Sequence, residues 1–142
     1  KYCRADGMIP FDCWMGQLRD LRTKARVLVQ LDRLSVGLPG DRKPVGAGVF
    51  ELRIREGKGY RVYFAWEESA VVLLLCGGEK ATQRRDIEIA KGGMTALARA
   101  AGVSRESLYR TLSRRGNPKI DTIMDLLRAL GLKLTVERTQ AA

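Results

Sequence analysis

Basic side chains alternate with apolar ones along two stretches that flank a short segment containing two glycines. "VFELRIRE" carries Arg53 and Arg55, and "YRVYFAW" carries Arg61 and Tyr63. Because residues two apart in a strand share a face, these stretches predict a hairpin with one basic and one apolar face. A guanidinium matches the geometry of phosphate, and an exposed tyrosine ring can stack on a base. The basic face is therefore a candidate phosphate-binding surface; the alternative is a solvated face on which Glu51 offsets part of the charge.

The two glycines also predict a register for this hairpin. If residues 57–59 form a three-residue loop, Arg55 faces Arg61 and Arg53 faces Tyr63 across the two strands. A slip by one residue would turn the arginines toward the apolar face. Like charges directly opposite one another destabilise a sheet, so the predicted arginine pair requires an explanation, and both the phosphate-binding surface and the solvated face remain open.

The residues that are missing or rare exclude several kinds of site. The sequence contains no histidine, which excludes Ser-His-Asp and Cys-His catalysis. Its three cysteines, Cys3, Cys13 and Cys76, are odd in number and show no C-x-x-C spacing. We therefore expect no metal site and no cofactor. A chain with so few cysteines fits a reducing compartment, so we expect a cytoplasmic protein.

The charge of the chain favours a polyanionic partner. The 142 residues carry a net charge of +10, and residues 92–142 hold nine basic against four acidic side chains. Such a balance is typical of proteins that bind nucleic acid, although some basic proteins are simply soluble. No apolar stretch approaches the roughly 20 residues that cross a membrane, and residues 1–12 resemble no signal peptide.

Helices and strands that would position the basic face can be placed around it. Apolar residues recur at helical spacing over residues 11–31, and this length predicts two packed helices with a break near residues 20–23. The apolar run "VVLLLC" predicts an inner strand that ends at Cys76. A helix over residues 81–91 follows, and Lys80 lies just before it at the rim of the sheet.

Residues 11–91 resemble the RelE/ParE superfamily of addiction-module killer toxins. The resemblance rests on "GDRKPVGAGVFELRI", "GKGYRVYF" and "VLLLCGGEKATQRRDIEIAK", which follow one another in the family's order. RelE-like members cleave messenger RNA on the ribosome with basic side chains, whereas ParE-like members attack gyrase. The resemblance implies catalytic roles for Lys43, Arg53, Arg61 and Lys80, and a base-stacking role for Tyr63. Relative to the family, the first strand has no clear counterpart in residues 1–10, and the last helix is shortened.

The remaining residues predict a helix-turn-helix. Residues 94–101 form its first helix, Gly102 ends that helix, and Ser104 caps a second helix over residues 105–113. The predicted shared core comprises Leu97, Ala98, Val103, Leu108 and Leu112. A generic three-helix packing unit is the alternative to a DNA-reading module.

A third helix over residues 120–130 ends at Gly131, and "LKLTVE" predicts a short strand over residues 132–137. A recognition helix enters the major groove with its N-terminus first, and arginine suits guanine edges or phosphates. The candidate DNA-binding residues are Ser104, Arg105, Ser107, Tyr109, Arg110, Arg114 and Arg115. "GMTALARAAGVSRESLYRTLS" and "LLRALGLKLTVE" resemble the Cro/repressor-type domain of HigA-like antidote proteins.

Gly92 and Gly93 lie where the two resemblances meet. We expect the helix over residues 81–91 to serve both units and to end at these glycines, because glycine commonly ends helices. A continuous helix is the alternative, since apolar residues keep near-heptad spacing through the glycines. Two interior glycines would cost such a helix about 2 kcal/mol.

Together these patterns predict an α+β fold in two units. Residues 1–91 form a toxin-like unit with a helical pair and a small antiparallel sheet. Residues 92–142 form an all-α helix-turn-helix unit with a short C-terminal strand. The interpretation is a type II toxin–antitoxin hybrid that binds operator double-stranded DNA as an autoregulatory, homodimeric repressor. The alternatives are a RelE-like ribonuclease acting on mRNA at the ribosome, and an inert scaffold for a cognate toxin or antidote.

Overall fold

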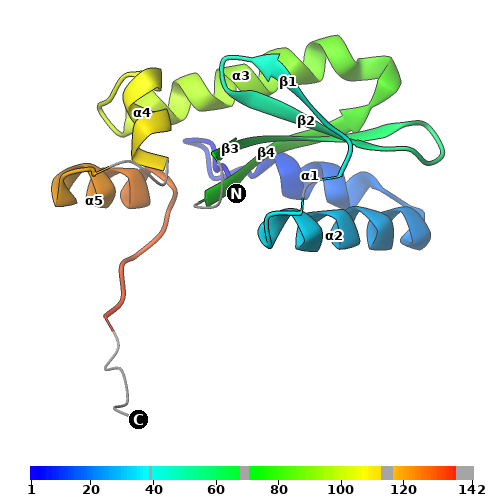
Figure 1. Cartoon of the computed structure of the whole chain (residues 1–142), viewed down its shortest axis with the longest axis horizontal. Helices are drawn as coiled ribbons and strands as arrows, with labels where there is room; N and C mark the ends of the chain where they lie inside the picture. Colours follow the sequence, from blue (N-terminus) through cyan, green and yellow to red (C-terminus); the bar gives the residue numbers. More distant parts are fainter. Residues whose placement is uncertain (39, 68–70, 113–116, 137–142) are drawn as a thin grey trace.

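A computed structural model describes residues 1–38, 40–67, 71–112 and 117–136, and it confirms the α+β class. A four-stranded antiparallel sheet lies between a helical pair and one long helix (Figure 1). The strands, in the spatial order β1-β2-β3-β4, are β1 (Arg42–Gly46), β2 (Val49–Ile54), β3 (Tyr60–Glu67) and β4 (Val71–Glu79). The helical elements are α1 (Pro10–Gln17), α2 (Leu21–Ser35), the 3-10 turn η1 (Lys80–Thr82), α3 (Gln83–Ala100), α4 (Arg105–Leu112) and α5 (Ile120–Ala129). No helix in these described ranges is long and apolar enough to cross a membrane.

The predicted break between the first two helices is confirmed. Asp20 caps α2: one carboxylate oxygen accepts a hydrogen bond from the Arg22 amide at 3.0 Å, and the other accepts one from the Thr23 hydroxyl at 2.7 Å. The apolar spacing across the break does not continue on one buried face, because Leu21 and Leu28 are exposed. Because the cap starts α2 as a separate helix, α2 can turn a different side toward the sheet from the one that the apolar spacing predicted. Thr23 is buried on that side, whereas Leu21 is exposed.

The hairpin between β2 and β3 has the predicted faces, but its predicted register is wrong. Arg53 pairs with Arg61 and Glu51 pairs with Tyr63, so the strands are shifted by two residues from the expected pairing. The turn spans residues 55–59 rather than 57–59, and Gly57 and Gly59 both take positive φ angles. Because a shift of two residues preserves which face each side chain occupies, the alternation of apolar and polar residues could not reveal it.

Both faces of the sheet are covered. In Figure 1, α1 and α2 lie below the sheet and α3 lies above it. The lower cluster of buried residues comprises Phe11, Leu18, Val27, Leu34, Leu52, Ile54, Val62 and Phe64. The opposite face, which the sequence predicted to be a basic surface, packs largely against α3.

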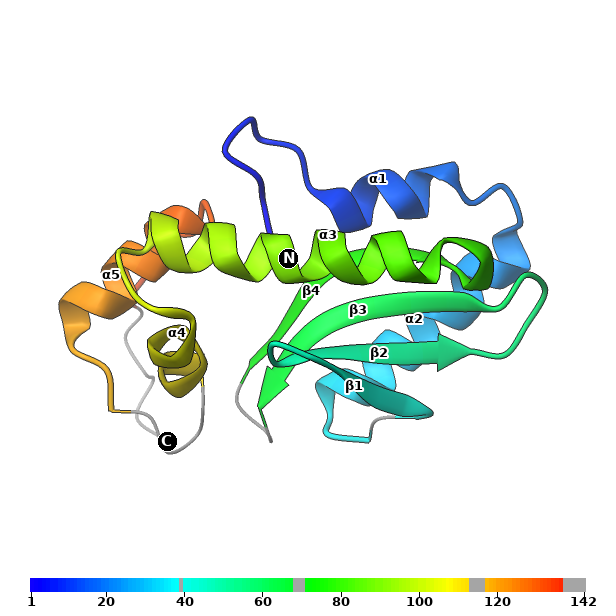
Figure 2. The ribbon, with the colours of Figure 1, turned by 90° about the horizontal axis from the view of Figure 1, so that it is seen from above.

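The predicted helix break at Gly92 and Gly93 is wrong. Helix α3 runs without interruption from Gln83 to Ala100 (Figure 2), so residues 94–101 form no separate helix. Gly93 lies on the buried face, where an added Cβ would come within 3.1 Å of the Tyr2 ring, whereas a Cβ on Gly92 would meet open space. Burial of apolar residues on both sides of the glycines, Ala90 and Met94 among them, offsets the helix cost of about 2 kcal/mol.

The three-helix arrangement after the sheet otherwise follows the prediction. Gly102 and Gly131 both take positive φ angles just after the ends of α3 and α5. The sequence predicted a strand over residues 132–137, but residues 132–136, the part of this segment that the structure describes, form no strand. Leu132 and Leu134 in this segment are each 56% exposed. A strand requires a partner for its backbone hydrogen bonds, and the described part of this chain provides none for this segment.

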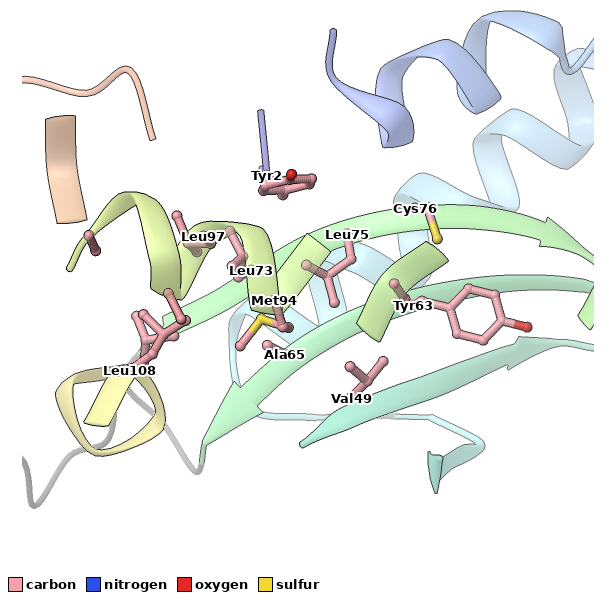
Figure 3. Packing of buried hydrophobic residues seen from close by; sticks show 14 of the residues in the cluster. Tyr2, Val49, Tyr63, Ala65, Leu73, Leu75, Cys76, Met94, Leu97 and Leu108 are labelled. Atoms are coloured by element: carbon pink, nitrogen blue, oxygen red, sulfur yellow. The ribbon is translucent and has the colours of Figure 1, made fainter. Parts of the chain in front are cut away.

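One hydrophobic cluster joins the sheet to the helix-turn-helix. Ala65 and Leu73 contribute from the strands, Met94 and Leu97 from α3, and Leu108 from α4 (Figure 3). All five side chains are at most 3% exposed. The helix-turn-helix therefore shares its core with the sheet rather than packing around a core of its own.

Candidate nucleic-acid interface

The sheet residues with predicted catalytic roles surround a buried carboxylate. Glu51 is 0% exposed and holds Arg53, whose Nε lies 3.0 Å from Glu51 Oε1. The other oxygen, Oε2, accepts hydrogen bonds from the Tyr63 hydroxyl at 3.2 Å and from the Gln83 amide at 2.7 Å. Arg61 Nε lies 3.4 Å from the same oxygen. The network ties β2, β3 and α3 together around one negative charge.

This network corrects the predicted role of Tyr63. Its side chain is 0% exposed beneath α3, so it is not available to stack on a base. Burial, together with the Glu51 charge and the hydrogen bond to Glu51, raises the pKa of the Tyr63 hydroxyl and keeps it protonated. The Tyr63 side chain thus serves as a buried hydrogen-bond donor that supports the Glu51 carboxylate.

Glu51 itself is kept ionised by its neighbours. Burial alone would raise the pKa of its carboxyl, but hydrogen bonds from Arg53 and Gln83, the Arg61 charge and the Tyr63 hydrogen bond outweigh that effect and lower the pKa below its usual 4.5. Arg53 and Arg61 therefore meet a permanent anion within the protein. Part of the positive charge that the sequence assigned to an incoming phosphate is already neutralised.

The predicted catalytic residues are only partly brought together. Arg61 and Lys80 both lie next to Gly59: Arg61 Nη1 is 3.5 Å and the Lys80 Cβ 3.3 Å from the position that a Cβ on Gly59 would take. Lys43 lies on β1 directly opposite Glu51 and is exposed. Arg61 is 11% exposed, whereas Lys43 and Lys80 lie at the surface. Arg55 lies in the turn and pairs with Asp41 at 2.8 Å, away from this group.

Helix α4 presents a polar face at its N-terminal end. The Ser104 hydroxyl oxygen accepts a hydrogen bond from the Ser107 amide at 3.1 Å, which confirms Ser104 as the N-cap. Arg105 and Arg110 are exposed, while Leu108 and Leu112 are buried against the core. The exposed face therefore carries the arginines predicted to meet DNA.

Glu106 and Tyr109 of α4 differ from the prediction for this exposed face. Glu106 is exposed between Arg105 and Arg110, and the predicted DNA-binding residues did not include it. A carboxylate on a recognition helix can accept a hydrogen bond from the cytosine amino group. Tyr109 is half-buried and points back into the molecule, where its hydroxyl donates to the Ala47 carbonyl at 2.6 Å. Arg114 and Arg115 lie outside the described residues.

The described residues contain no group of three or more His, Cys, Asp or Glu side chains arranged to hold a metal ion. The chemistry available at this surface is that of guanidinium, ammonium, carboxylate and hydroxyl groups. Such groups bind phosphates and base edges.

Comparison with known families separates the chain into two overlapping segments. Residues 16–95 match the family described as "Phage derived protein Gp49-like (DUF891)", and this match covers more than half of the chain. The chain belongs to this family. Residues 80–138 of the Gp49-like chain also match a family described as "Probable addiction module antidote protein". Both segments include residues 80–95, which hold η1 and the first part of α3.

Two relatives of the Gp49-like chain come from Haemophilus influenzae, and each is named "Uncharacterized protein". The first is 49% identical over 83 residues, which are 58% of this chain and 84% of the relative. The second is 45% identical over 49 residues, which are 34% of this chain and 50% of the relative. No solved structure matches the chain. The toxin-like and antidote families together support a role related to toxin–antitoxin modules.

Proposed function

We propose that this chain is a toxin–antitoxin hybrid whose helix-turn-helix binds operator DNA as an autoregulatory repressor. The observation that carries the proposal is the exposed face of α4. Arg105, Glu106 and Arg110 project from a helix that is capped by Ser104 and packed on α3 and on β3 of the sheet. This helix lies within the segment that matches the antidote family. A short helix that is fixed on neighbouring elements and polar at its N-terminal end suits entry into the major groove.

Helix α3 serves both units in this proposal. It begins in the Gp49-like segment and continues into the antidote-like segment without a break, and the two family matches overlap on its first part. On the sheet side it supplies Gln83 to the Glu51 network, and farther along it supplies Leu97 to the core beneath α4. One rigid helix thus positions the reading helix relative to the sheet.

The repressor acts as a homodimer in this proposal. A single recognition helix reads only a half-site, and two-fold symmetric dimers read inverted repeats. Residues 132–136 belong to no helix or strand of the described structure, and Leu132 and Leu134 are exposed. In this proposal the segment pairs with the same segment of a second copy as a strand. Light scattering on the Leu132→Ser/Leu134→Ser variant should show a monomer where the parent chain shows a dimer. An unchanged dimer would place the interface elsewhere.

The test of DNA binding is selection of bound duplexes from a random pool at about 0.15 M salt, where phosphate contacts alone bind weakly. We expect an inverted repeat to be enriched. Arg105→Ala and Arg110→Ala should each weaken binding by about 1–3 kcal/mol and relax the preference at one position of the half-site. Arg33→Ala on α2, on the opposite face of the sheet, is the matched control. Failure to enrich any sequence would reject the proposal.

RNA cleavage is the competing function, and the buried network argues against it. The predicted stacking residue, Tyr63, is covered, and Arg53 and Arg61 already pair with Glu51. Expression of the chain should therefore leave mRNA intact and growth unaffected. Growth arrest that disappears in Arg61→Ala would favour the ribonuclease instead.

A further inference from the structure

The turn between β1 and β2 lies against the N-terminal half of α4. Ala47 and Gly48 line a notch of about 260 Å³ together with Arg105, Glu106 and Tyr109. Both views show the turn beside α4 (Figures 1 and 2). A surface that meets Arg105 and Glu106 will therefore lie next to this turn as well.

The turn is held firmly in that place. Gly46, Ala47 and Gly48 all have positive φ angles, of 95°, 51° and 67°, and Ala47 is the one non-glycine residue with such an angle in the described ranges. The Tyr109 hydroxyl bonds to the Ala47 carbonyl, and the Tyr109 ring occupies the space that a Cβ on Gly48 would need. A backbone conformation that is rare for alanine persists here because Tyr109 packs against it.

Two exposed or half-exposed lysines flank the turn on the α3 side of the sheet. Lys91 of α3 places its Nζ 3.6 Å from the position of a Cβ on Gly46. Lys43 precedes the turn on β1, and its register partner Glu51 bonds to Gln83 of α3, which places Lys43 on the same side. The acidic neighbour of Lys91 is Glu88, at 3.8 Å, whose side chain is 72% exposed. An ion pair with one partner so exposed contributes little energy, so it presents only a small barrier to phosphate binding at Lys91.

We propose that the β1–β2 turn, with Lys43 and Lys91, forms a second DNA-contacting surface that binds the backbone phosphates beside the half-site read by α4. This inference rests on the proposed DNA-binding function. A helix that enters the major groove N-terminus first brings its neighbouring loops onto the sugar–phosphate backbone that borders the groove. The turn is the element that borders α4 on this side, and the two lysines that flank it, Lys43 of β1 and Lys91 of α3, carry positive charge that attracts phosphates. The toxin-like sheet therefore extends the DNA footprint beyond the helix-turn-helix.

The experiment measures the affinity of the full chain for its selected duplex over a range of salt concentrations. Each phosphate contact contributes about 0.9 to the slope of log affinity against log salt concentration. Lys43→Gln and Lys91→Gln should each lower the slope by about 0.9, and the double variant by about twice that, with the preferred sequence unchanged. Lys24→Gln on α2, beneath the opposite face of the sheet, is the matched control and should leave the slope unchanged. Circular dichroism verifies that each variant is folded.

Phosphate-ethylation interference gives a second measurement, which locates the contacts on the DNA backbone. Ethylation of backbone positions just outside the half-site should block binding of the parent chain, and this block should vanish in the double lysine variant. Slopes and interference patterns that are unchanged in the lysine variants would overturn the inference while leaving the repressor intact. Tighter binding by Lys91→Gln would also overturn it, because the turn would then shield α4 from DNA. A parent chain with no sequence preference would reject the proposed function, and this inference with it.

Discussion

The Tyr109 hydroxyl donates a 2.6 Å hydrogen bond to the carbonyl of Ala47, which lies 62 residues earlier in the chain. Ala47 belongs to the segment that matches the Gp49-like family, and Tyr109 belongs to the segment that matches the antidote family. The bond joins a hairpin turn of the sheet to the helix proposed to read DNA. Because the two segments also share one hydrophobic cluster, a substitution at the turn should also change the packing of the helix-turn-helix.

Gly48→Ala tests this coupling. The added Cβ would overlap the Tyr109 ring, so the ring must move, and we expect a loss of about 1–3 kcal/mol in the free energy of unfolding. Urea denaturation measures the loss. Gly37→Ala is the matched control, because Gly37 also has a positive φ angle but open space around it, and it should show backbone strain alone. Equal losses in the two variants would show that Tyr109 does not restrict the turn.

A double-mutant cycle separates the overlap with the Tyr109 ring from the backbone strain at Gly48. In a Tyr109→Ala background the substitution at Gly48 should cost only the backbone strain seen at Gly37, because the overlapping ring is gone. Tyr109→Phe should cost about 1 kcal/mol through the lost hydrogen bond to Ala47. Costs that simply add in the double variant would contradict the contact.

The two glycines in α3 should respond oppositely to alanine. Gly92→Ala places a methyl group in open space within a helix and should raise the free energy of unfolding by up to about 1 kcal/mol. Gly93→Ala gains the same helix propensity but brings a Cβ to 3.1 Å from the Tyr2 ring, so it should stabilise less or destabilise. Urea denaturation of both variants provides the comparison. A destabilised Gly92→Ala variant would contradict a continuous helix.

Much of the fold was predictable because it follows from local patterns. The helix break near residues 20–23, the alternation in β2 and β3 and the Gly102 stop each depend on a few neighbouring residues. The register of the hairpin was not predictable, because a shift of two residues leaves the same side chains on each face. The length of the turn decides the register, and the glycine positions suit a loop of three or of five residues.

The candidate site was harder to predict, since long-range packing determines it. Alternation correctly assigned Arg61 and Tyr63 to one face, but it could not show that α3 would cover that face. The pairing of Glu51 with Tyr63 in the register changes the interpretation of the basic face, because its arginines and Tyr63 lie around a buried carboxylate instead of forming an open phosphate site. Nothing local to Tyr109 indicated that it would contact Ala47.

The cysteines should differ widely in reactivity. Burial, assisted by the Asp86 charge, raises the pKa of the Cys76 thiol to about 12, whereas Cys13 is exposed. Because the thiolate is the reactive form, a thiol reagent at pH 8 should modify Cys13 rapidly and leave Cys76 unmodified in the folded chain. Mass spectrometry of the labelled peptides identifies the sites. Labelling of Cys76 at the rate of Cys13 without denaturant would contradict the burial of Cys76 beside α3.

Removal of the Glu51 charge should destabilise the sheet strongly. Glu51→Gln leaves Arg61 nearly buried without its anion, and breaking a buried ion pair by removing one partner costs about 3–5 kcal/mol. Thermal or urea unfolding at neutral pH measures this loss. Glu88→Gln, which removes an exposed partner of Lys91, is the matched control and should change stability by no more than about 0.5 kcal/mol.

The pH dependence of the stability difference between the parent chain and Glu51→Gln tests whether the Glu51 charge causes that difference. The folded protein holds the pKa of Glu51 below its usual 4.5, so the unfolded chain takes up the proton first as the pH falls. The stabilisation from Glu51 is therefore complete above about pH 4.5 and is lost as the pH falls through the lower pKa of the folded state. The stability gap between the parent chain and Glu51→Gln should narrow over that acidic range, while other carboxyls titrate alike in both proteins. A gap that stays constant from neutral pH into the acidic range would show that the variant loses packing rather than an ion pair.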